Sequence, residues 1–456
     1  MKKYDKYKEY PYDWLPVIPA HWEEKSLRNY FFLSDERKGE KTDLELLSVY
    51  REYGVIPKAS RDDNKNVESE DTSKYKVVHK TDLVINKMKL WQGSLGISQY
   101  EGFVSPAYIV AHNKFDGNLR YLNFFLRSPL VKTYYNRISY GIRVGQWDSD
   151  FYSFKQLVIP VPQKDEQDQI VRYLDWQISK INHLIHGYQK QIKLLDERKT
   201  TVINEAVTRG THADVEMQAV EANWVKEIPA HWEFNKVKQH FEIKKRIAGK
   251  EGYDVISITQ QGLKVKDIAS NEGQMAANYS KYQFVYPGDY AMNHMDLLTG
   301  FIGLSDIFGV TSPDYRVFSA IDVERTDLKY FLYVFQLGYK RKIFYGLGRG
   351  AANKGRWRMP AINFKNYDIP APPIEEQREI VEYIEQETEK IDLLKREVEK
   401  QIEYLREYRT RLISDVVTGQ IDVRDVVIPE YTPEEDTEID IDDIGEGAEE
   451  VAEDAE

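Results

Sequence analysis

The chain has 456 residues, enough for about three domains of ordinary size. It contains no cysteine, which excludes disulfides, thiolate metal sites and a cysteine nucleophile, and favours a reducing, cytoplasmic location. Neither a secretion signal nor an apolar stretch long enough to cross a membrane is present, so we expect a protein that is neither secreted nor membrane-spanning. The formal net charge of −12 would by itself argue against a nucleic-acid partner.

That acidity is concentrated at the C-terminal end of the chain. Residues 430–456 contain 14 acidic and no basic residues, and removing them leaves 63 basic against 61 acidic residues, a net charge of +2. The segment has few aromatic residues and no apolar period. We therefore expect residues 421–456 to form a disordered acidic tail, either a solvated extension or a docking or autoinhibitory segment.

The chain repeats itself at an offset of 210 residues. The hexapeptide IPAHWE at 18–23 returns at 228–233, and the block at 159–171 aligns with 369–381. Two distant blocks with one offset indicate a duplicated unit with constant edges and a divergent interior. Each hexapeptide holds one histidine, His21 or His231, with no other histidine or cysteine at ligand spacing, so we interpret both as structural.

Within each unit, short runs rich in Val, Ile and Tyr between turn residues predict β-strands. Helical apolar spacing over 119–135 and 328–344 then predicts a helix, and a glycine-rich loop follows it. We expect a mixed α/β globule in each half, over residues 1–158 and 228–368. The predicted strands lie within 44–53, 75–86, 253–259 and 282–293.

Beyond each globule, apolar residues recur at alternating steps of four and three, the pattern of a heptad seam. The pattern covers two spacer regions, 159–210 and 369–420. A linker at 211–227 joins the first spacer region to the second globule, and the tail follows the second spacer region from residue 421. Each predicts a helix of about 45 residues at 1.5 Å rise, with Gly210 or Gly419 near its end. Because neither seam is closed alone, we expect an antiparallel two-helix coiled coil that separates the globules with pseudo-two-fold symmetry; the alternative is that each helix binds a different protein.

Positive charge gathers at equivalent places in the two units. Residues 328–367 contain nine Lys or Arg and no acid, and residues 117–147 contain five and no acid. Aromatic residues interleave with both runs. Cations beside rings are typical of nucleic-acid surfaces, while a solvated helix face is the plainer interpretation of either run alone.

Catalytic motifs are weak in this sequence. The glycines at 346–350 lack the spacing and the downstream acid of a dinucleotide-binding loop, so we interpret this segment as a basic loop. Asp314, Asp327 and Lys329 imitate the carboxylate and lysine set of a metal-dependent nuclease, but the first unit does not repeat the pattern. We therefore expect no catalytic residue and no metal site in this chain.

The tandem blocks resemble the specificity subunits of type I DNA restriction-modification enzymes, over the whole chain apart from the acidic tail. The Trp…Ile-Pro-x-His-Trp openings, the Ile-Pro-x-Pro blocks continuing into Glu-Gln-x-x-Ile-Val-x-Tyr, and Thr418-Gly419 carry the resemblance. It implies one target recognition domain per unit and a restriction-system complex with two modification (methyltransferase) subunits and with translocating restriction (nuclease) subunits. S-adenosylmethionine, ATP and magnesium are expected in those partners and not in this chain.

The resemblance further implies that each domain reads one half of a bipartite, asymmetric double-stranded DNA site, with the helices setting the separation of the half-sites. Arg and Lys suit guanine, and Asn and Gln suit adenine. A stand-alone metal-dependent nuclease and a coiled-coil scaffold are the alternatives. The candidate DNA-binding residues are Lys87, Lys89, Gln92, Arg143 and Gln146 in the first domain and Gln260, Gln261, Asn293, His294, Arg349, Asn353, Lys354 and Arg356 in the second.

Overall fold

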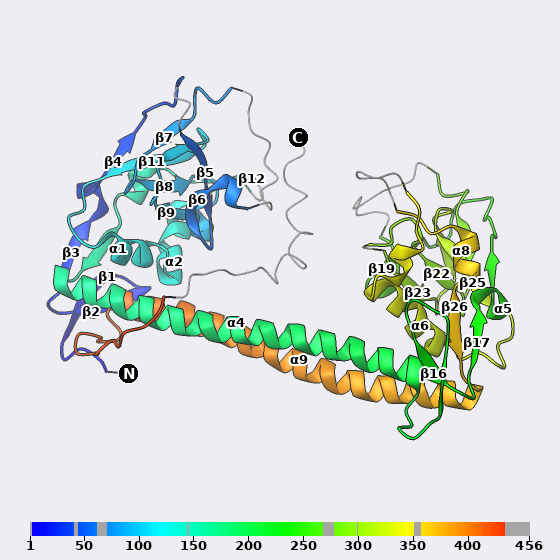
Figure 1. The fold of residues 1–456 in the computed structure, drawn as a ribbon. Coiled ribbons are helices and arrows are strands. Elements are labelled where there is room, and N and C mark those ends of the chain that lie inside the picture. Colours follow the sequence, from blue (N-terminus) through cyan, green and yellow to red (C-terminus); the bar gives the residue numbers. More distant parts are fainter. Residues whose placement is uncertain are drawn as a thin grey trace. The chain divides into compact units, whose positions relative to one another are not determined.

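The computed structural model describes residues 2–40, 44–61, 71–143, 146–267, 278–298, 300–350 and 357–433, with the side chains of 142, 143 and 146 left out. The chain forms two compact units, residues 1–188 with 400–456 and residues 189–399. Both are mixed α/β, and each includes part of both long helices (Figure 1). Over the described residues, no helix has a stretch long and apolar enough to span a membrane.

The first unit is built on two four-stranded sheets, whose strand orders are β4-β11-β8-β9 and β6-β5-β10-β7. Short pairs β1-β2, β3-β14 and β12-β13 surround them. The bounds are β1 Tyr7–Tyr12, β2 Leu15–Pro19, β3 Glu23–Ser26, β4 Phe31–Ser34, β5 Glu45–Tyr50, β6 Gly54–Pro57, β7 Lys76–Val78, β8 Leu83–Asn86, β9 Leu95–Ile97, β10 Gly102–Val104, β11 Tyr108–Asn113, α1 Leu119–Leu126, α2 Pro129–Ile138, β12 Tyr140–Arg143, β13 Gln146–Asp148, α3 Phe151–Phe154 and β14 Val158–Val161.

The second unit repeats the central sheet with the order β18-β25-β22-β23. Strand pairs β15-β16, β17-β26, β19-β20 and β21-β24 accompany it. The bounds are β15 Met217–Ala219, β16 Glu227–Pro229, β17 Glu233–Lys236, α5 Val237–His240, β18 Phe241–Lys244, β19 Ile256–Thr259, β20 Gly262–Val265, β21 Gln283–Val285, β22 Tyr290–Met292, β23 Ile302–Leu304, β24 Gly309–Thr311, β25 Arg316–Ala320, α6 Leu328–Lys340, α7 Ile343–Gly346, α8 Ala361–Lys365 and β26 Asp368–Ala371.

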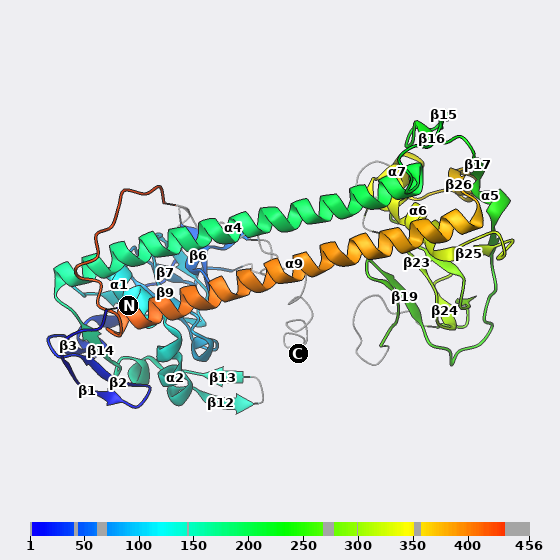
Figure 2. The ribbon, with the colours of Figure 1, turned by 90° about the horizontal axis from the view of Figure 1, so that it is seen from below.

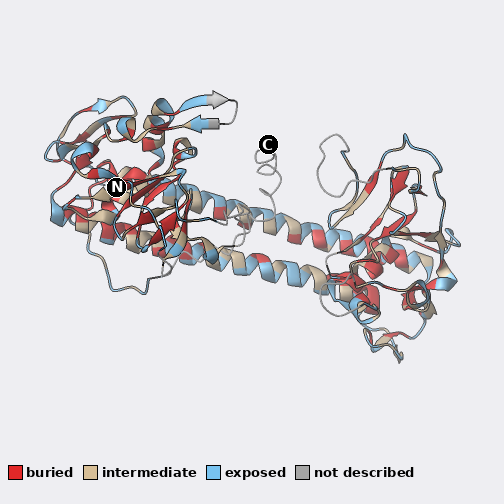
Figure 3. Cartoon of the chain, turned by 90° about the horizontal axis from the view of Figure 1, so that it is seen from above, coloured by how far each residue is buried: buried red, intermediate tan, exposed pale blue. Residues whose placement is uncertain are grey.

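The predicted interior helix is interrupted in both units. In the first unit, Pro129 starts a new helix because its ring fixes φ and its nitrogen has no hydrogen to donate, which separates α1 from α2. In the second unit, the break falls at Lys342, which adopts the left-handed conformation with φ 56° between α6 and α7. Buried side chains concentrate on the sheets and on the helices that cover them (Figure 3).

The two long helices, α4 (Lys164–Arg209) and α9 (Ile374–Val417), have 46 and 44 residues and pack side by side (Figure 2). In the first unit, Arg409 donates a 2.8 Å hydrogen bond to Asn182. In the second unit, Lys199 binds Asp392 at 2.7 Å. Lys395 of α9 also binds Asp196 of α4 at 3.0 Å, so positions fall along α9 as they rise along α4 in the second unit. In the first unit, Tyr121 contacts both Pro160, just before α4, and Val417, at the end of α9. The pairing is therefore antiparallel in each unit, as predicted.

The repeated sequence blocks form a bonded frame between the start of each unit and the start of its long helix. Glu166 accepts hydrogen bonds from Trp22 Nε1 at 3.0 Å and Tyr4 at 2.7 Å, and it lies 2.8 Å from His21 Nε2. His231 Nε2 lies at the same 2.8 Å from Glu376. Both shared histidines are thus paired with a glutamate, in agreement with the structural interpretation.

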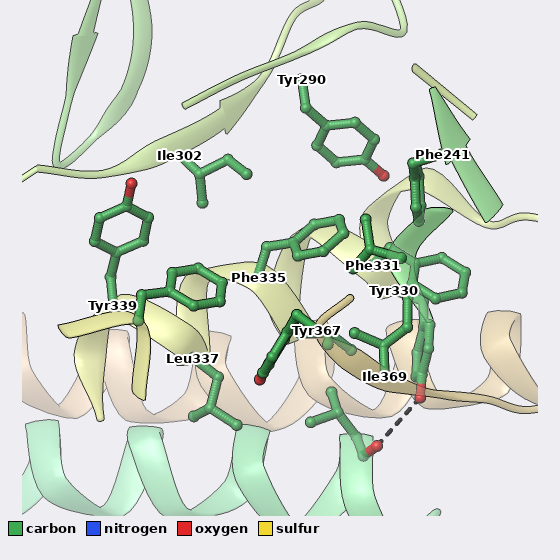
Figure 4. Packing of buried hydrophobic residues seen from close by; sticks show 14 of the residues in the cluster. Phe241, Tyr290, Ile302, Tyr330, Phe331, Phe335, Leu337, Tyr339, Tyr367 and Ile369 are labelled. Atoms are coloured by element: carbon green, nitrogen blue, oxygen red, sulfur yellow. Dashed lines mark hydrogen bonds between the residues drawn. The ribbon is translucent and has the colours of Figure 1, made fainter. Parts of the chain in front are cut away.

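A second pair of frame contacts holds the end of each long helix. The Tyr121 hydroxyl lies 2.8 Å from the Pro160 carbonyl oxygen and 3.2 Å from that of Val417, at the end of α9. Tyr330 in the second unit contacts the Val207 carbonyl at 3.1 Å, at the end of α4 (Figure 4). Carbonyls in the last turn of a helix have no partner inside the helix, so each tyrosine satisfies one of them.

Two predicted boundaries need correction. The linker predicted at 211–227 contains β15, which pairs with β16 in the register that β1 and β2 also use. The tail predicted from 421 begins too early, because Asp422 and Val423 are buried and the Asp422 amide donates to the Lys2 carbonyl at 2.9 Å. Residues 434–456 lie outside the described residues, and disorder there stays a prediction.

We predict that Gly419→Ala lowers the midpoint of thermal unfolding, measured by circular dichroism. Gly419 has φ 76°, and an added Cβ would lie 2.3 Å from Pro19 Cδ. The left-handed conformation alone costs an alanine about 1 to 2 kcal/mol. Gly187→Ala, in the middle of α4 with no atom within 4 Å of the added Cβ, is the matched control and should gain about 0.5 to 1 kcal/mol. Equal midpoints for the two variants would contradict this account.

Candidate nucleic-acid interface

In the first unit, the structure brings together two segments that carry candidate residues. One is the loop after β8, residues 86–93, called here the first Asn loop, which holds Lys87, Lys89 and Gln92. The other is the β12-β13 hairpin. Lys87 Nζ lies 2.8 Å from Asp148 Oδ2, and the rings of Trp91 and Trp147 are 5.9 Å apart. Arg143 and Gln146 are on this hairpin, but their side chains lie outside the described part of the chain.

The second unit brings the equivalent segments together with different chemistry. The second Asn loop, residues 293–298, meets the finger base, defined as residues 347–350 and 357–359. The Met359 amide donates to the His294 carbonyl at 2.9 Å, and Arg349 pairs with Arg358 through both backbone bonds. Trp357 stacks on Tyr345 and donates to its carbonyl at 2.7 Å. The candidates Asn353, Lys354 and Arg356 fall on residues outside those described.

The Asn293 side chain shapes its own loop, whereas the His294 imidazole has a buried nitrogen without a partner among the described residues. The Asn293 side-chain oxygen accepts the Met295 amide at 3.2 Å, which shapes the loop. His294 Nδ1 is buried with no hydrogen-bond partner among the described residues. Burial, followed by the charges of Arg316 and Arg358, lowers the pKa of His294 to about 4. The imidazole is therefore neutral at pH 7, which suits a hydrogen bond to a base edge better than an ion pair with phosphate.

Arg316 is a residue that the sequence reasoning missed. It is only 5% exposed on β25, and its guanidinium donates to the Met359 carbonyl at 2.8 Å. Burial lowers its pKa to about 10. The equivalent strand position in the first unit is Ile109, since both residues pair with the residue just before the Asn loop. A charge inside an apolar strand was the signal available in the sequence.

The remaining candidates, Gln260 and Gln261, form the turn between β19 and β20. They line a cavity of about 540 Å³ together with Leu298 of the second Asn loop. Gln261 also accepts a hydrogen bond from Lys264 at 2.5 Å. The hairpin turn and the finger base therefore both adjoin the second Asn loop, although they are distant in sequence.

The comparisons with known proteins agree with this duplicated arrangement. The profile of the family described as "Type I restriction modification DNA specificity domain" matches residues 19–194 and again 229–404. The chain belongs to this family. The two matched segments are themselves 210 residues apart, which is the offset of the repeat.

Related proteins cover most of the chain. The type I restriction enzyme MjaVIII specificity subunit from Methanocaldococcus jannaschii is 23% identical over 90% of this chain and 95% of the relative. The MjaX specificity subunit of the same organism is 24% identical over 79% of this chain and 83% of the relative. A similar fold occurs in a solved structure whose title concerns complex assembly and conformational transition of the type I R-M system. The match has a TM-score of 0.57 at 14% identity and covers 90% of this chain and 100% of that one. This last likeness shows a shared fold.

The two basic runs, 117–147 and 328–367, contain no acid in sequence, but acids from other segments lie next to them in the fold. Arg120 pairs with Asp175 at 2.6 Å, and Lys329, its counterpart, pairs with Glu385 at 2.5 Å. These acids come from the long helices, so sequence distance concealed them. Further cations of the runs bind elsewhere in the fold: Arg127 to the carbonyls of Arg51 and Glu52, Arg137 to Asp13, and Arg341 to Asn204.

Two of the three residues of the nuclease alternative, Asp327 and Lys329, have structural roles. Asp327 caps α6 by accepting the amides of Lys329 and Tyr330 at 2.9 and 3.0 Å. Asn118 does the same for α1 in the first unit, so the position serves helix capping in both copies. Within the described ranges, no group of three or more His, Cys, Asp or Glu residues is arranged to hold a metal ion.

We predict that His294 makes stability depend on pH between about 4 and 6.5. Its pKa is lower in the folded chain than the value of about 6.5 expected after unfolding. The unfolded chain therefore binds more protons in this window, and stability is lost as pH falls through it. The unfolding midpoint of His294→Gln should fall less steeply with falling pH than that of the unaltered chain. Parallel curves for the two proteins would disprove the assignment.

Proposed function

We propose that this chain is the specificity subunit of a type I restriction-modification complex and reads a bipartite, asymmetric double-stranded DNA site. One observation carries the proposal. The histidine–glutamate pair and the tyrosine contact of the frame recur in both units. The loops that the frame presents are anchored differently, through Lys87 and Asp148 in one unit and through Arg316 and Met359 in the other. Differently anchored loops present different side chains to DNA, and so each unit is suited to its own half-site.

The long helices act as the spacer in this proposal. Tyr121 and Tyr330 tie the recognition units to the ends of α9 and α4, so that each unit is fixed on the helix pair and not on a flexible linker. Readers with two-fold symmetry commonly recognise half-sites about one helical turn, roughly 34 to 36 Å, apart. The proposal therefore assigns the separation of the half-sites to the pair of long helices.

The chemistry is proposed to lie in partner subunits of a cytoplasmic complex. Two modification subunits would bind S-adenosylmethionine, and the restriction subunits would use ATP and magnesium. Support comes from the nuclease-like residues of this chain, since Asp327 caps a helix and Lys329 is paired with Glu385. This chain would select the DNA without catalysing its modification or cleavage.

The candidate contacts are proposed to differ in kind. Lys87 is already neutralised by Asp148, so we assign it to positioning the β12-β13 hairpin. His294 is assigned to a base edge because its imidazole is neutral. The other proposed base or phosphate contacts are Lys89, Gln92, Arg143, Gln146, Gln260, Gln261, Asn293, Arg349, Asn353, Lys354 and Arg356.

We predict that exchanging residues 31–155 for the matching interior of another family member changes one half-site only. This segment lies between β3 and β14 and leaves His21, Trp22 and Glu166 of the frame in place. Methylome mapping of a host carrying the exchanged chain should show a new half-site, with the other half-site and the spacing retained. An unchanged target, or a change in both half-sites, would rule out one unit per half-site.

We predict that Arg316→Ile, which installs the residue of the first unit, relaxes recognition of the second half-site alone. Removing the guanidinium frees the Met359 carbonyl and the finger base, and misplaced base contacts lose about 1 to 3 kcal/mol of discrimination each. Binding to duplexes altered in one half-site at a time measures the effect. Ile109→Val in the first unit is the control and should leave both half-sites unchanged. Equal relaxation of both half-sites by Arg316→Ile would contradict the assignment.

A further inference from the structure

The 540 Å³ cavity of the second unit is a groove at the C-terminal end of α6, called here the α6 groove. The β19-β20 turn contributes Gln260 and Gln261 to one side of it, and α6 contributes Gln336 and Lys340. Lys342 and, from α4, Lys199 complete the polar lining used below. The groove thus combines three amides and three ammonium groups with the carboxylate of Asp392.

Two of these lysines make no direct ion pair. Lys199 is paired with Asp392, both of whose oxygens lie at 2.7 Å. The side chains of Lys340 and Lys342 make no hydrogen bond or ion pair with any described residue. Burial and the charge of Lys199 lower the pKa of Lys340, and the more weakly acting Asp196 and Asp392 oppose this shift. An anion in the groove would give both lysines a direct partner.

The backbone at this end of α6 is also strained. Lys342 is one of two non-glycine residues with positive φ among the described residues, at 56°. Non-glycine residues rarely adopt this conformation, and such strain often marks a functional position. Here it occurs at a lysine that lines the groove.

The first unit narrows the equivalent place. Arg127 and Gln336 each lie nine residues after the N-cap of their helix, at Asn118 and Asp327. Arg127 donates to the carbonyls of Arg51 and Glu52, which ties the β5-β6 turn to the helix, and it lines a cavity of about 190 Å³. Gln336 donates instead to the Ile302 carbonyl, at 3.4 Å. The second unit therefore has the larger cavity, and lysines line it.

We propose that the α6 groove binds the DNA backbone, with Lys340 and Lys342 each contacting a phosphate next to the half-site that the second unit reads. This inference rests on the proposed function. The groove is continuous with the candidate reading surface, because Gln260, Gln261 and Leu298 line it. A phosphate would be a direct anionic partner for each lysine, and the glutamine amides can donate hydrogen bonds to phosphate oxygens.

The test uses the specificity chain assembled with its modification subunits and a duplex carrying the methylome-mapped site. Binding is measured over a salt series for Lys340→Gln, Lys342→Gln and the double variant. Each lost phosphate contact should reduce the slope of log K against log salt by about 0.9, without changing the preferred sequence. The control is Lys365→Gln, which removes an exposed charge of the same basic run from α8, outside the groove, and should leave the slope unchanged.

A stability measurement separates loss of binding from misfolding. Because Lys340 is exposed and makes no hydrogen bond or ion pair with a described residue, Lys340→Gln should keep the midpoint of thermal unfolding while weakening binding. Unchanged slopes for both variants, with an unaltered complex that binds its site, would overturn the groove assignment and leave the proposed function standing. A change in the number of bound modification subunits, seen by native mass spectrometry with no change in slope, would show a protein-docking face and also overturn it. Absence of sequence-specific binding by the unaltered complex would overturn the proposed function itself.

Discussion

The structure depends on the burial of the last turn of each long helix. A helix end has carbonyl groups with no partner inside the helix, and burying them without donors is unfavourable. Tyr121 meets this need for α9 and Tyr330 meets it for α4, and Gly419 and Gly210 turn the chain away at the same φ of 76°. Each unit therefore closes around the last turn of one of the long helices.

This constraint explains why the repeat is strict at its edges and loose inside. The edge residues bond to one another, as Trp22 and His21 do with Glu166, so a change in one leaves a buried polar partner unsatisfied. The interior loops need a contact that holds them to the rest of the unit, but this contact can differ between the units. An ion pair and two tryptophans supply it in the first unit, and a buried arginine supplies it in the second. Recognition can diverge without disturbing the frame.

The cations of the interior helices also differ between the part that contacts the long helices and the part beside the loops. The cations at the start of the interior helices, Arg120 and Lys329, are paired with acids of the long helices and help to dock them. At the far end of α6, Lys340 and Lys342 make no direct ion pair with a described residue, and Asp392, which lines the same groove, is paired with Lys199. These two lysines lie beside the loops that carry the candidate reading residues, where a polyanion would find direct partners.

The sequence by itself determined the duplication, the α/β character of each unit, the two long helices and their glycine ends. These follow from exact repeats, from heptad spacing and from the backbone freedom of glycine, which are all local properties. Only the tertiary structure decided which cations are neutralised, that Asp327 caps a helix, and that Arg316 holds the finger base. Ion pairs and loop contacts join residues tens to hundreds of positions apart. No local pattern encodes which of them meet, because the packing of the sheets and the long helices brings them together.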